Sequence, residues 1–275
     1  MFALGVIDCL CIILAYFYTG YWYMIGYEYC MYPYTSYWVG NLNTVVINTC
    51  FMLSMLLAFN RFLDMWKPEI GERLFKANRT WIFVFAAVLF GVFGAYYSIP
   101  AFFSTDFGTF IYHPLIPGKE NLKYYTIFQP IINMFTGVSI CLCYSSICIV
   151  YWMRLRHGNL QTQTDFQKRI LIQAVLICFP TFTVTCMWTS FNFITPTSFL
   201  MNVAHLNWQL MHAVPAFVYL FVNKTIRRRA FVMIFACIGV TPGNSYHTNS
   251  KVDSTPSKSI ELQSPNEDPH QNPRD

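Results

Sequence analysis

Polar side chains that could do chemistry interrupt the apolar runs of this sequence at a few positions. Asp8 lies in the first run, and His205 and His212 lie seven residues apart in the last. An ionisable group inside an apolar segment is costly unless it faces the interior of a bundle and finds a partner. We therefore expect Asp8 to be an interior polar node that could hold an ion or water, or else to lie near one end of its helix. The two histidines share a helical stripe, where they either serve a site or are hydrogen-bonded packing residues.

A second polar set lies in the next apolar run. Asn41, Thr44 and Asn48 are three, four and seven residues apart, which places them on one face of a helix. Such a face either lines a ligand cavity or supplies hydrogen bonds between helices.

No pattern typical of catalysis or of metal binding occurs. The sequence has no H-E-x-x-H, nucleophile elbow or Walker loop. The ten cysteines are scattered, without a C-x-x-C or a Cys/His spacing that indicates zinc. A haem between helices would need axial ligands from two helices, whereas both histidines lie in one apolar run. We predict no catalytic residue, no metal and no cofactor, and hence no enzyme.

The elements that position these residues follow from composition. Hydrophobic residues make up 55% of the 275 residues and charged residues only 11%, whereas a soluble domain has roughly a quarter charged. A membrane-spanning helix needs roughly 20 mostly apolar residues, so the fold class is all-α, a polytopic transmembrane bundle. Six apolar segments are long enough, at about residues 2–24, 36–60, 80–103, 125–153, 170–194 and 198–222.

Basic residues sit between these segments and set the expected orientation. They concentrate in residues 61–79, 154–169 and 224–229, and the positive-inside rule places these three stretches in the cytosol. With six helices, both termini are then cytosolic, and the net charge of +5 reports topology rather than nucleic-acid binding. The polar tail at 241–275 has few large apolar residues, which predicts disorder.

Several separate blocks of the sequence, taken in their order along the chain, resemble one family. They are LFKANRTW at 74–81, WQLMHAVPA at 208–216 and NKTIR at 223–227, with Asn60-Arg61 before them. Together these blocks resemble the nematode serpentine receptors of class T, a chemoreceptor family. The resemblance spans about residues 1–227 and implies a seven-helix, rhodopsin-like receptor that couples to heterotrimeric G proteins.

The chain departs from that pattern because it has six segments rather than seven. Asp8 matches the family's second helix, so Met1 falls near the start of that helix and the first helix is expected to be absent. The expected cytosolic N-terminus agrees with the loss of one helix. A truncated gene model and a genuine six-helix product both stay open.

The resemblance assigns Arg61 to the end of the receptor's third helix, where it could contact a G protein. A snorkelling anchor in the lipid headgroups is the alternative. Asp64, three residues on, could restrain the arginine in a resting state. The candidate G-protein-coupling residues are Asn60, Arg61, Phe62, Arg154, Arg156 and Arg169. The basic residues among them could equally bind anionic lipid.

Two further groups complete the predicted site. The candidate ligand pocket consists of Asn41, Thr44, Asn48, Trp188 and His205. The candidate conformational switch consists of Asp8, Phe179, Pro180, His212, Pro215 and Tyr219. A proline inside a helix kinks it, and each kink is either a hinge or a fixed bend that improves packing.

The sequence thus predicts a chemosensory-type G-protein-coupled receptor. Its expected partners are a small-molecule ligand, a heterotrimeric G protein and the lipid bilayer, with no nucleic acid and with a receptor dimer left open. The expected place is the plasma membrane or a sensory cilium, or the endoplasmic reticulum if a truncated form is retained. The alternatives are a channel or transporter subunit and a truncated receptor that does not signal.

Overall fold

The computed structural model describes residues 2–76, 78–113, 115–116, 118–119, 126–156, 165–222, 227–228 and 231–233. The chain divides into two units, Met1–Ala230 and Phe231–Asp275, and all elements below belong to the first. The predicted tail at 241–275 lies outside the described residues. Along the chain the elements are α1 (Phe2–Ile12), η1 (Ile13–Tyr18), α2 (Thr19–Met24), α3 (Pro33–Trp66), α4 (Pro68–Phe75), α5 (Asn78–Tyr97), β1 (Phe102–Ser104), β2 (Thr109–Ile111), α6 (Phe128–Arg156), α7 (Asp165–Ser190) and α8 (Ser198–Val222).

The first segment is a helix with a π turn, η1, in its middle. The wider π turn displaces the regular hydrogen-bond ladder, and the Ala15 carbonyl oxygen accepts a bond from the Thr19 hydroxyl. The segment as a whole runs from Phe2 to Met24.

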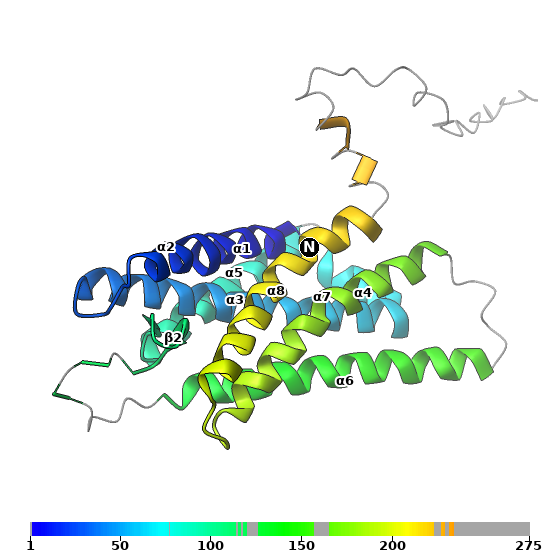
Figure 1. Ribbon diagram of the computed structural model, residues 1–275. Coiled ribbons are helices and arrows are strands. Elements are labelled where there is room, and N and C mark those ends of the chain that lie inside the picture. The colour runs from blue at the N-terminus through cyan, green and yellow to red at the C-terminus, as the bar shows by residue number, and fades with distance from the viewer. Residues whose placement is uncertain are drawn as a thin grey trace, which may run out of the picture. The chain divides into compact units, whose positions relative to one another are not determined.

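The helix α3 is the centre of the bundle. It contacts α1, α4, α5, α6 and α7, and Figure 1 shows it in blue beside α1. Pro33 begins it at a position where the missing N–H costs nothing. It ends at Trp66 because Pro68 disfavours the helical conformation at Lys67. The helix has 34 residues, so it extends past the predicted segment 36–60 at both ends.

Two glycines bring α5 against α3. A Cβ atom at Gly91 would lie 2.5 Å from the Val45 carbonyl oxygen, and one at Gly94 would lie 2.5 Å from Asn48 Nδ2. Small residues allow this close approach of backbones in membrane bundles, where dispersion contacts replace the hydrophobic effect.

The helix α5 ends at Tyr97, whereas the predicted segment extended to Phe103. Pro100 explains the difference, because proline cannot continue the hydrogen-bond ladder and restricts the residue before it. The chain forms an antiparallel hairpin instead, in which Phe103 of β1 pairs with Phe110 of β2. Gly108, with a φ of 63°, makes the turn, and Thr105 Oγ1 donates to the Tyr27 carbonyl oxygen at 2.6 Å. The bundle end that carries this hairpin is called the hairpin end below, and the opposite one the Arg61 end.

The last three helices close the bundle. Contacts join α6 to α7, α7 to α8 and α8 to α1, and Figure 1 shows α8 in yellow between α1 and α7. Pro180 lies inside α7 and Pro215 inside α8, so both helices continue through their prolines.

Five helical segments of the described chain are long and apolar enough to cross a membrane. They are Phe2–Met24, Pro33–Trp66, Asn78–Tyr97, Phe128–Arg154 and Leu171–Ser190. The sixth predicted segment forms α8 but does not reach the same hydropathy, because Asn202, His205, Asn207, Gln209 and His212 lie in it. The all-α polytopic fold class is confirmed, with a two-stranded hairpin added.

Candidate functional site

A cavity of about 290 Å³ opens at the hairpin end. It lies among α3, α6, α7, α8 and β2, and we call it the hairpin-end pocket. Its lining includes Asn43, Thr44, Gln129, Trp188 and Trp208. The volume is at the lower end of the range of ligand pockets, roughly 300–1,000 Å³, so the pocket suits a small molecule.

The lining of the hairpin-end pocket is apolar and neutral. None of the described residues that line it carries a charge. Burial raises the pKa of the Tyr112 phenol well above its usual range, so this hydroxyl also stays neutral and can donate a hydrogen bond. A charged ligand would find no counter-ion among these side chains, and desolvating it would be costly.

Three buried polar atoms from residues that line this pocket have no partner within the described chain. They are Asn43 Oδ1, Gln129 Oε1 and Trp208 Nε1, and their side chains are at most 6% exposed. Buried polar atoms are nearly always hydrogen-bonded in native proteins. Two acceptors and one donor of the lining residues therefore lack partners, and because each atom is itself enclosed, its side chain would have to turn toward the pocket to meet a ligand.

The predicted pocket residues divide into two groups. Thr44 and Trp188 line the hairpin-end pocket, whereas Asn41, Asn48 and His205 do not. Asn41 is partly buried and donates to the Tyr37 carbonyl oxygen of its own helix. Asn48 is fully buried and accepts a hydrogen bond from Gln129 Nε2 at 3.2 Å.

His205 belongs to a chain of polar contacts between the hairpin and η1. Its Nδ1 lies 3.1 Å from Thr109 Oγ1 in β2, and its Nε2 lies 3.2 Å from Gln209 Nε2. Gln209 in turn donates to the Ala15 carbonyl oxygen at 2.8 Å. Thr109 lines the pocket, so these contacts tie one pocket wall to the π turn.

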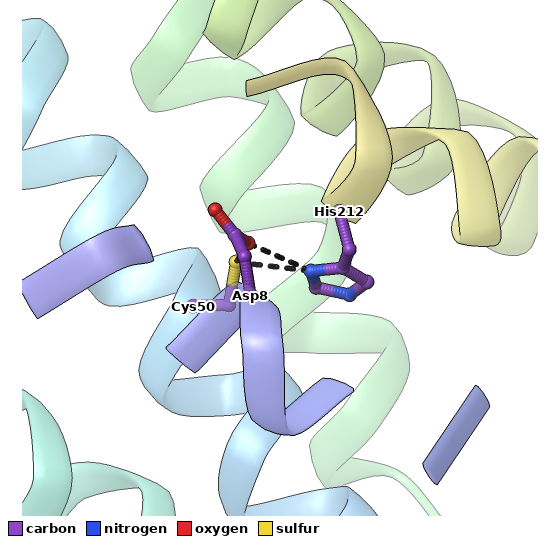
Figure 2. Close-up of side chains that lie close together, drawn as sticks. All are labelled: Asp8, Cys50 and His212. Atoms are coloured by element: carbon purple, nitrogen blue, oxygen red, sulfur yellow. Dashed lines mark hydrogen bonds and ion pairs between the residues drawn. The ribbon is translucent and has the colours of Figure 1, made fainter. Parts of the chain in front are cut away.

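Asp8, Cys50 and His212 meet deeper in the bundle, in what we call the Asp8 cluster. Figure 2 shows the three side chains converging from α1, α3 and α8. Asp8 Oδ1 lies 2.9 Å from His212 Nδ1, and Cys50 Sγ lies 3.8 Å from the first atom and 3.9 Å from the second. All three residues are buried. The structure thus brings together two predicted switch residues, Asp8 and His212, and adds a cysteine.

Trp208 lies between the hairpin-end pocket and the Asp8 cluster. It lines the pocket, and its ring meets the His212 ring edge to face, with centroids 6.0 Å apart. A displacement of this indole by a ligand would press directly on the histidine that pairs with Asp8.

The other predicted switch residues lie apart from the cluster. Phe179 is exposed, next to Pro180 in α7. The Thr183 hydroxyl lies 2.8 Å from the Pro180 carbonyl oxygen and 3.2 Å from Asn207 Oδ1 of α8, so α7 and α8 are linked beside this proline. Pro215 is buried in α8, and the side chain of Tyr219 lies outside the described part of the chain.

At the Arg61 end, Arg61 Nη1 donates to Asp64 Oδ2 at 2.7 Å. The Arg61 side chain is 17% exposed and that of Asp64 is 42% exposed, so the pair lies at the margin of the bundle. Phe62 stacks on Trp66 with ring centroids 5.5 Å apart.

Asn60 lines a second cavity, of about 320 Å³, among α1, α3, α4 and α5. Of the basic candidates on α6 and α7, Arg154 is partly buried and Arg156 lies 3.7 Å from the ring centroid of Trp152. The side chain of Arg169 lies outside the described residues.

Sequence reasoning missed Asn43, Gln129, Trp208 and Cys50. Asn43 could have been found, because polar residues in an apolar run are informative and it precedes Thr44. Cys50 gave no such signal, since a cysteine in an apolar run behaves as a small hydrophobe.

Comparisons with known proteins give a family match over most of the chain. Residues 1–240 match the family described as serpentine type 7TM GPCR chemoreceptor Srt. The chain is also similar to serpentine receptor class T-55 of Caenorhabditis elegans, with 22% identity over 222 residues. That alignment covers 80% of this chain and 60% of the relative, so the chain spans about three-fifths of the relative's length. No solved structure matches.

Proposed function

The chain belongs to the serpentine type 7TM GPCR chemoreceptor family Srt, and from this premise we propose that it is a chemosensory G-protein-coupled receptor. A small molecule binds in the hairpin-end pocket, and a heterotrimeric G protein binds at the Arg61 end. The ligand favours the conformer that it binds more tightly, and the G protein selects the same conformer. The family match confirms the resemblance seen in the residue blocks, and receptor rather than catalytic function is typical of this family.

The single observation that carries the ligand-binding part is the chemistry of the hairpin-end pocket. Its described lining residues are uncharged, and three of them hold buried polar atoms, two acceptors and one donor, that lack partners in the described chain. A small, uncharged molecule with an apolar body and a group that both donates and accepts hydrogen bonds, such as an alcohol, phenol or amide, fits this pattern. Ammonium and carboxylate ligands do not fit it.

The route from ligand to G protein is proposed through Trp208 and the Asp8 cluster. The indole contacts His212, which pairs with Asp8, so a shift of Trp208 changes the contact between α8 and α1. The helices α7 and α8 contact one another, and α7 carries Pro180 as a candidate hinge. Arg61, tied to Asp64, exchanges this partner for the G protein.

The ligand test is a response screen in cells that express the chain, both as it stands and behind the first helix of a class T relative. Size-matched uncharged, cationic and anionic compounds are compared by second-messenger output. We expect responses to the uncharged set only, and Trp188→Ala should lower potency by about tenfold, equivalent to 1.4 kcal/mol. Responses confined to charged compounds would contradict the pocket assignment.

The coupling test uses Arg61. Arg61→Ala should abolish the second-messenger response while surface delivery stays normal. Arg61→Lys should also impair coupling, because lysine lacks the planar, multidentate guanidinium, whereas a headgroup anchor would tolerate the lysine. Asp64→Asn is the matched control, since it removes the intrahelical partner and leaves the arginine, and it should raise basal output. Ionic current without any G protein would favour a channel instead.

Cell-surface labelling of the same cells tests location. The chain is a multi-pass membrane protein, and we propose that it works at the plasma membrane or in a sensory cilium. Retention in the endoplasmic reticulum, relieved by the added helix, would instead support a form that does not signal alone.

A further inference from the structure

We propose that the Asp8 cluster is a zinc site that binds one Zn²⁺ between α1, α3 and α8. The observations behind this proposal do not rest on ligand binding or on G-protein coupling, although the proposed route between those sites passes through the same cluster. The three donor types, a carboxylate, a thiol and an imidazole, are the side chains that bind zinc in proteins. Each comes from a different helix (Figure 2).

The distances between the donor atoms fit a shared ion. A tetrahedral zinc bonded to oxygen, nitrogen and sulfur holds these atoms about 3.3 to 3.6 Å apart. The observed separations are 2.9 Å between Asp8 Oδ1 and His212 Nδ1, and 3.8 and 3.9 Å from these atoms to Cys50 Sγ. Side-chain movements of a few tenths of an ångström therefore suffice for binding.

The cluster also leaves one oxygen for the ion. Asp8 Oδ2 is buried and has no hydrogen-bond partner within the described chain. A carboxylate that turned toward the metal would bring this atom to it as a second, longer contact in a distorted site, with three protein ligands in all. The unpaired oxygen thus acquires a partner that the polypeptide does not offer.

Charge balance supports a divalent ion in this environment. A net charge in the interior of a membrane bundle is strongly disfavoured. One Zn²⁺ with the Asp8 carboxylate, the Cys50 thiolate and a neutral His212 sums to zero. Binding releases the thiol proton, and the imidazole proton moves to Nε2, which is buried and without a partner in the described structure. Combined thiolate and imidazole ligands favour zinc over magnesium or calcium.

Zinc bound in this way would cross-link three helices that are far apart in the sequence and that no disulfide joins among the described cysteines. Asp8 and His212 are 204 residues apart in sequence, and the described cysteines form no disulfide. The ion would therefore stabilise one arrangement of α1 against α3 and α8.

The test measures metal content. The full chain is expressed in cells grown with added zinc, purified in detergent and desalted, and zinc is counted by mass spectrometry against protein. We expect about one zinc per chain, and Cys50→Ala and His212→Gln should each lower it at least about tenfold. Cys178→Ala is the matched control, because Cys178 is equally buried but lies on α7 outside the cluster, and it should keep the metal.

A second measurement works on the unaltered protein. Loading with cobalt instead of zinc should give the intense near-ultraviolet absorption of a thiolate–cobalt bond. Zinc-free protein from zinc-supplemented cells, zinc retained by both ligand variants, or cobalt loading without this absorption would each overturn the proposal. If the unaltered chain binds zinc but gives no second-messenger response to the uncharged compounds, the result counts against the proposed receptor function and not against the zinc site.

Discussion

In the hairpin-end pocket, Asn43 Oδ1, Gln129 Oε1 and Trp208 Nε1 are buried without partners. In the Asp8 cluster, one aspartate oxygen lies within reach of both an imidazole and a thiol. The two regions meet at Trp208, which lines the first and contacts the second. The pocket has open space beside its unpaired groups, whereas the cluster joins helices through packed polar side chains, with Asp8 Oδ2 and His212 Nε2 unpaired in the described structure.

This difference teaches how stability and binding are divided in the bundle. A buried polar atom left unpaired costs roughly 1–3 kcal/mol. A ligand that supplied the missing hydrogen bonds would therefore gain part of this free energy on binding. In the cluster, Asp8, Cys50 and His212 already contact one another across three helices. Removing one of these side chains leaves another buried polar group without its partner. Substitutions in the cluster should therefore act on folding, and substitutions of pocket side chains that make no hydrogen bond to another helix should act mainly on binding.

The largest effect is expected from Asp8→Leu. It leaves His212 buried without its carboxylate, which should lower the free energy of unfolding by about 3 kcal/mol. The measurement is unfolding of the purified chain by sodium dodecyl sulfate in mixed micelles, with a chelator present so that metal does not contribute. The double variant with His212→Leu should recover part of the loss, because neither polar partner then remains. A double variant less stable than the single one would show that the pair is not what joins α1 to α8.

Gln129→Leu should have an intermediate effect. Gln129 Nε2 lies 3.2 Å from Asn48 Oδ1 of α3 and 3.3 Å from Asn133 Oδ1 of its own helix, so the change removes one bond that links α6 to α3 and one bond within α6. The expected loss is about 1–2 kcal/mol in the same unfolding measurement. Met134→Leu, an exposed change one turn from these contacts, is the control and should be nearly silent. Equal losses for both variants would argue against the hydrogen bonds.

Asn43→Leu should change stability by less than about 1 kcal/mol, because its oxygen has no partner to lose. It should nevertheless weaken the response to an uncharged agonist by about tenfold, equivalent to 1.4 kcal/mol. Dose–response curves and unfolding measurements on the same variant test these two expectations together. A large loss of stability with unchanged potency would reverse the assignment of Asn43 from pocket to core.

The smallest effect is expected from Asn41→Ala. This side chain is only partly buried and is bonded within its own helix, so the change should stay within about 0.5 kcal/mol and leave potency unchanged. A shift in agonist potency would show that the ligand site reaches further along α3 than the described lining of the pocket.

Much of the fold was predictable because hydropathy is a local property. Six long apolar runs, with basic residues between them, predicted the helical bundle, and the structure differs mainly where prolines act. Pro100 ends α5 early and permits the hairpin, and Pro33 and Pro68 bound a longer α3. Helix ends depend on such single residues and on tertiary contacts, so the broad pattern does not define them.

The site was only half predictable. Asp8, Thr44, Trp188 and His212 stood out because a polar or large aromatic group in an apolar run is unusual. The sequence did not show that Asp8 and His212 meet each other and Cys50, since Cys50 lies 42 residues from Asp8 and 162 from His212.

By itself, then, the sequence determined the membrane-spanning class and the family, because these properties follow from local composition and residue blocks. It indicated no metal, because zinc motifs are recognised by short spacings and the three donors here have none. Only the tertiary structure decided which polar groups meet and which stay unpaired, because helices from distant parts of the chain must pack before their side chains can share a partner.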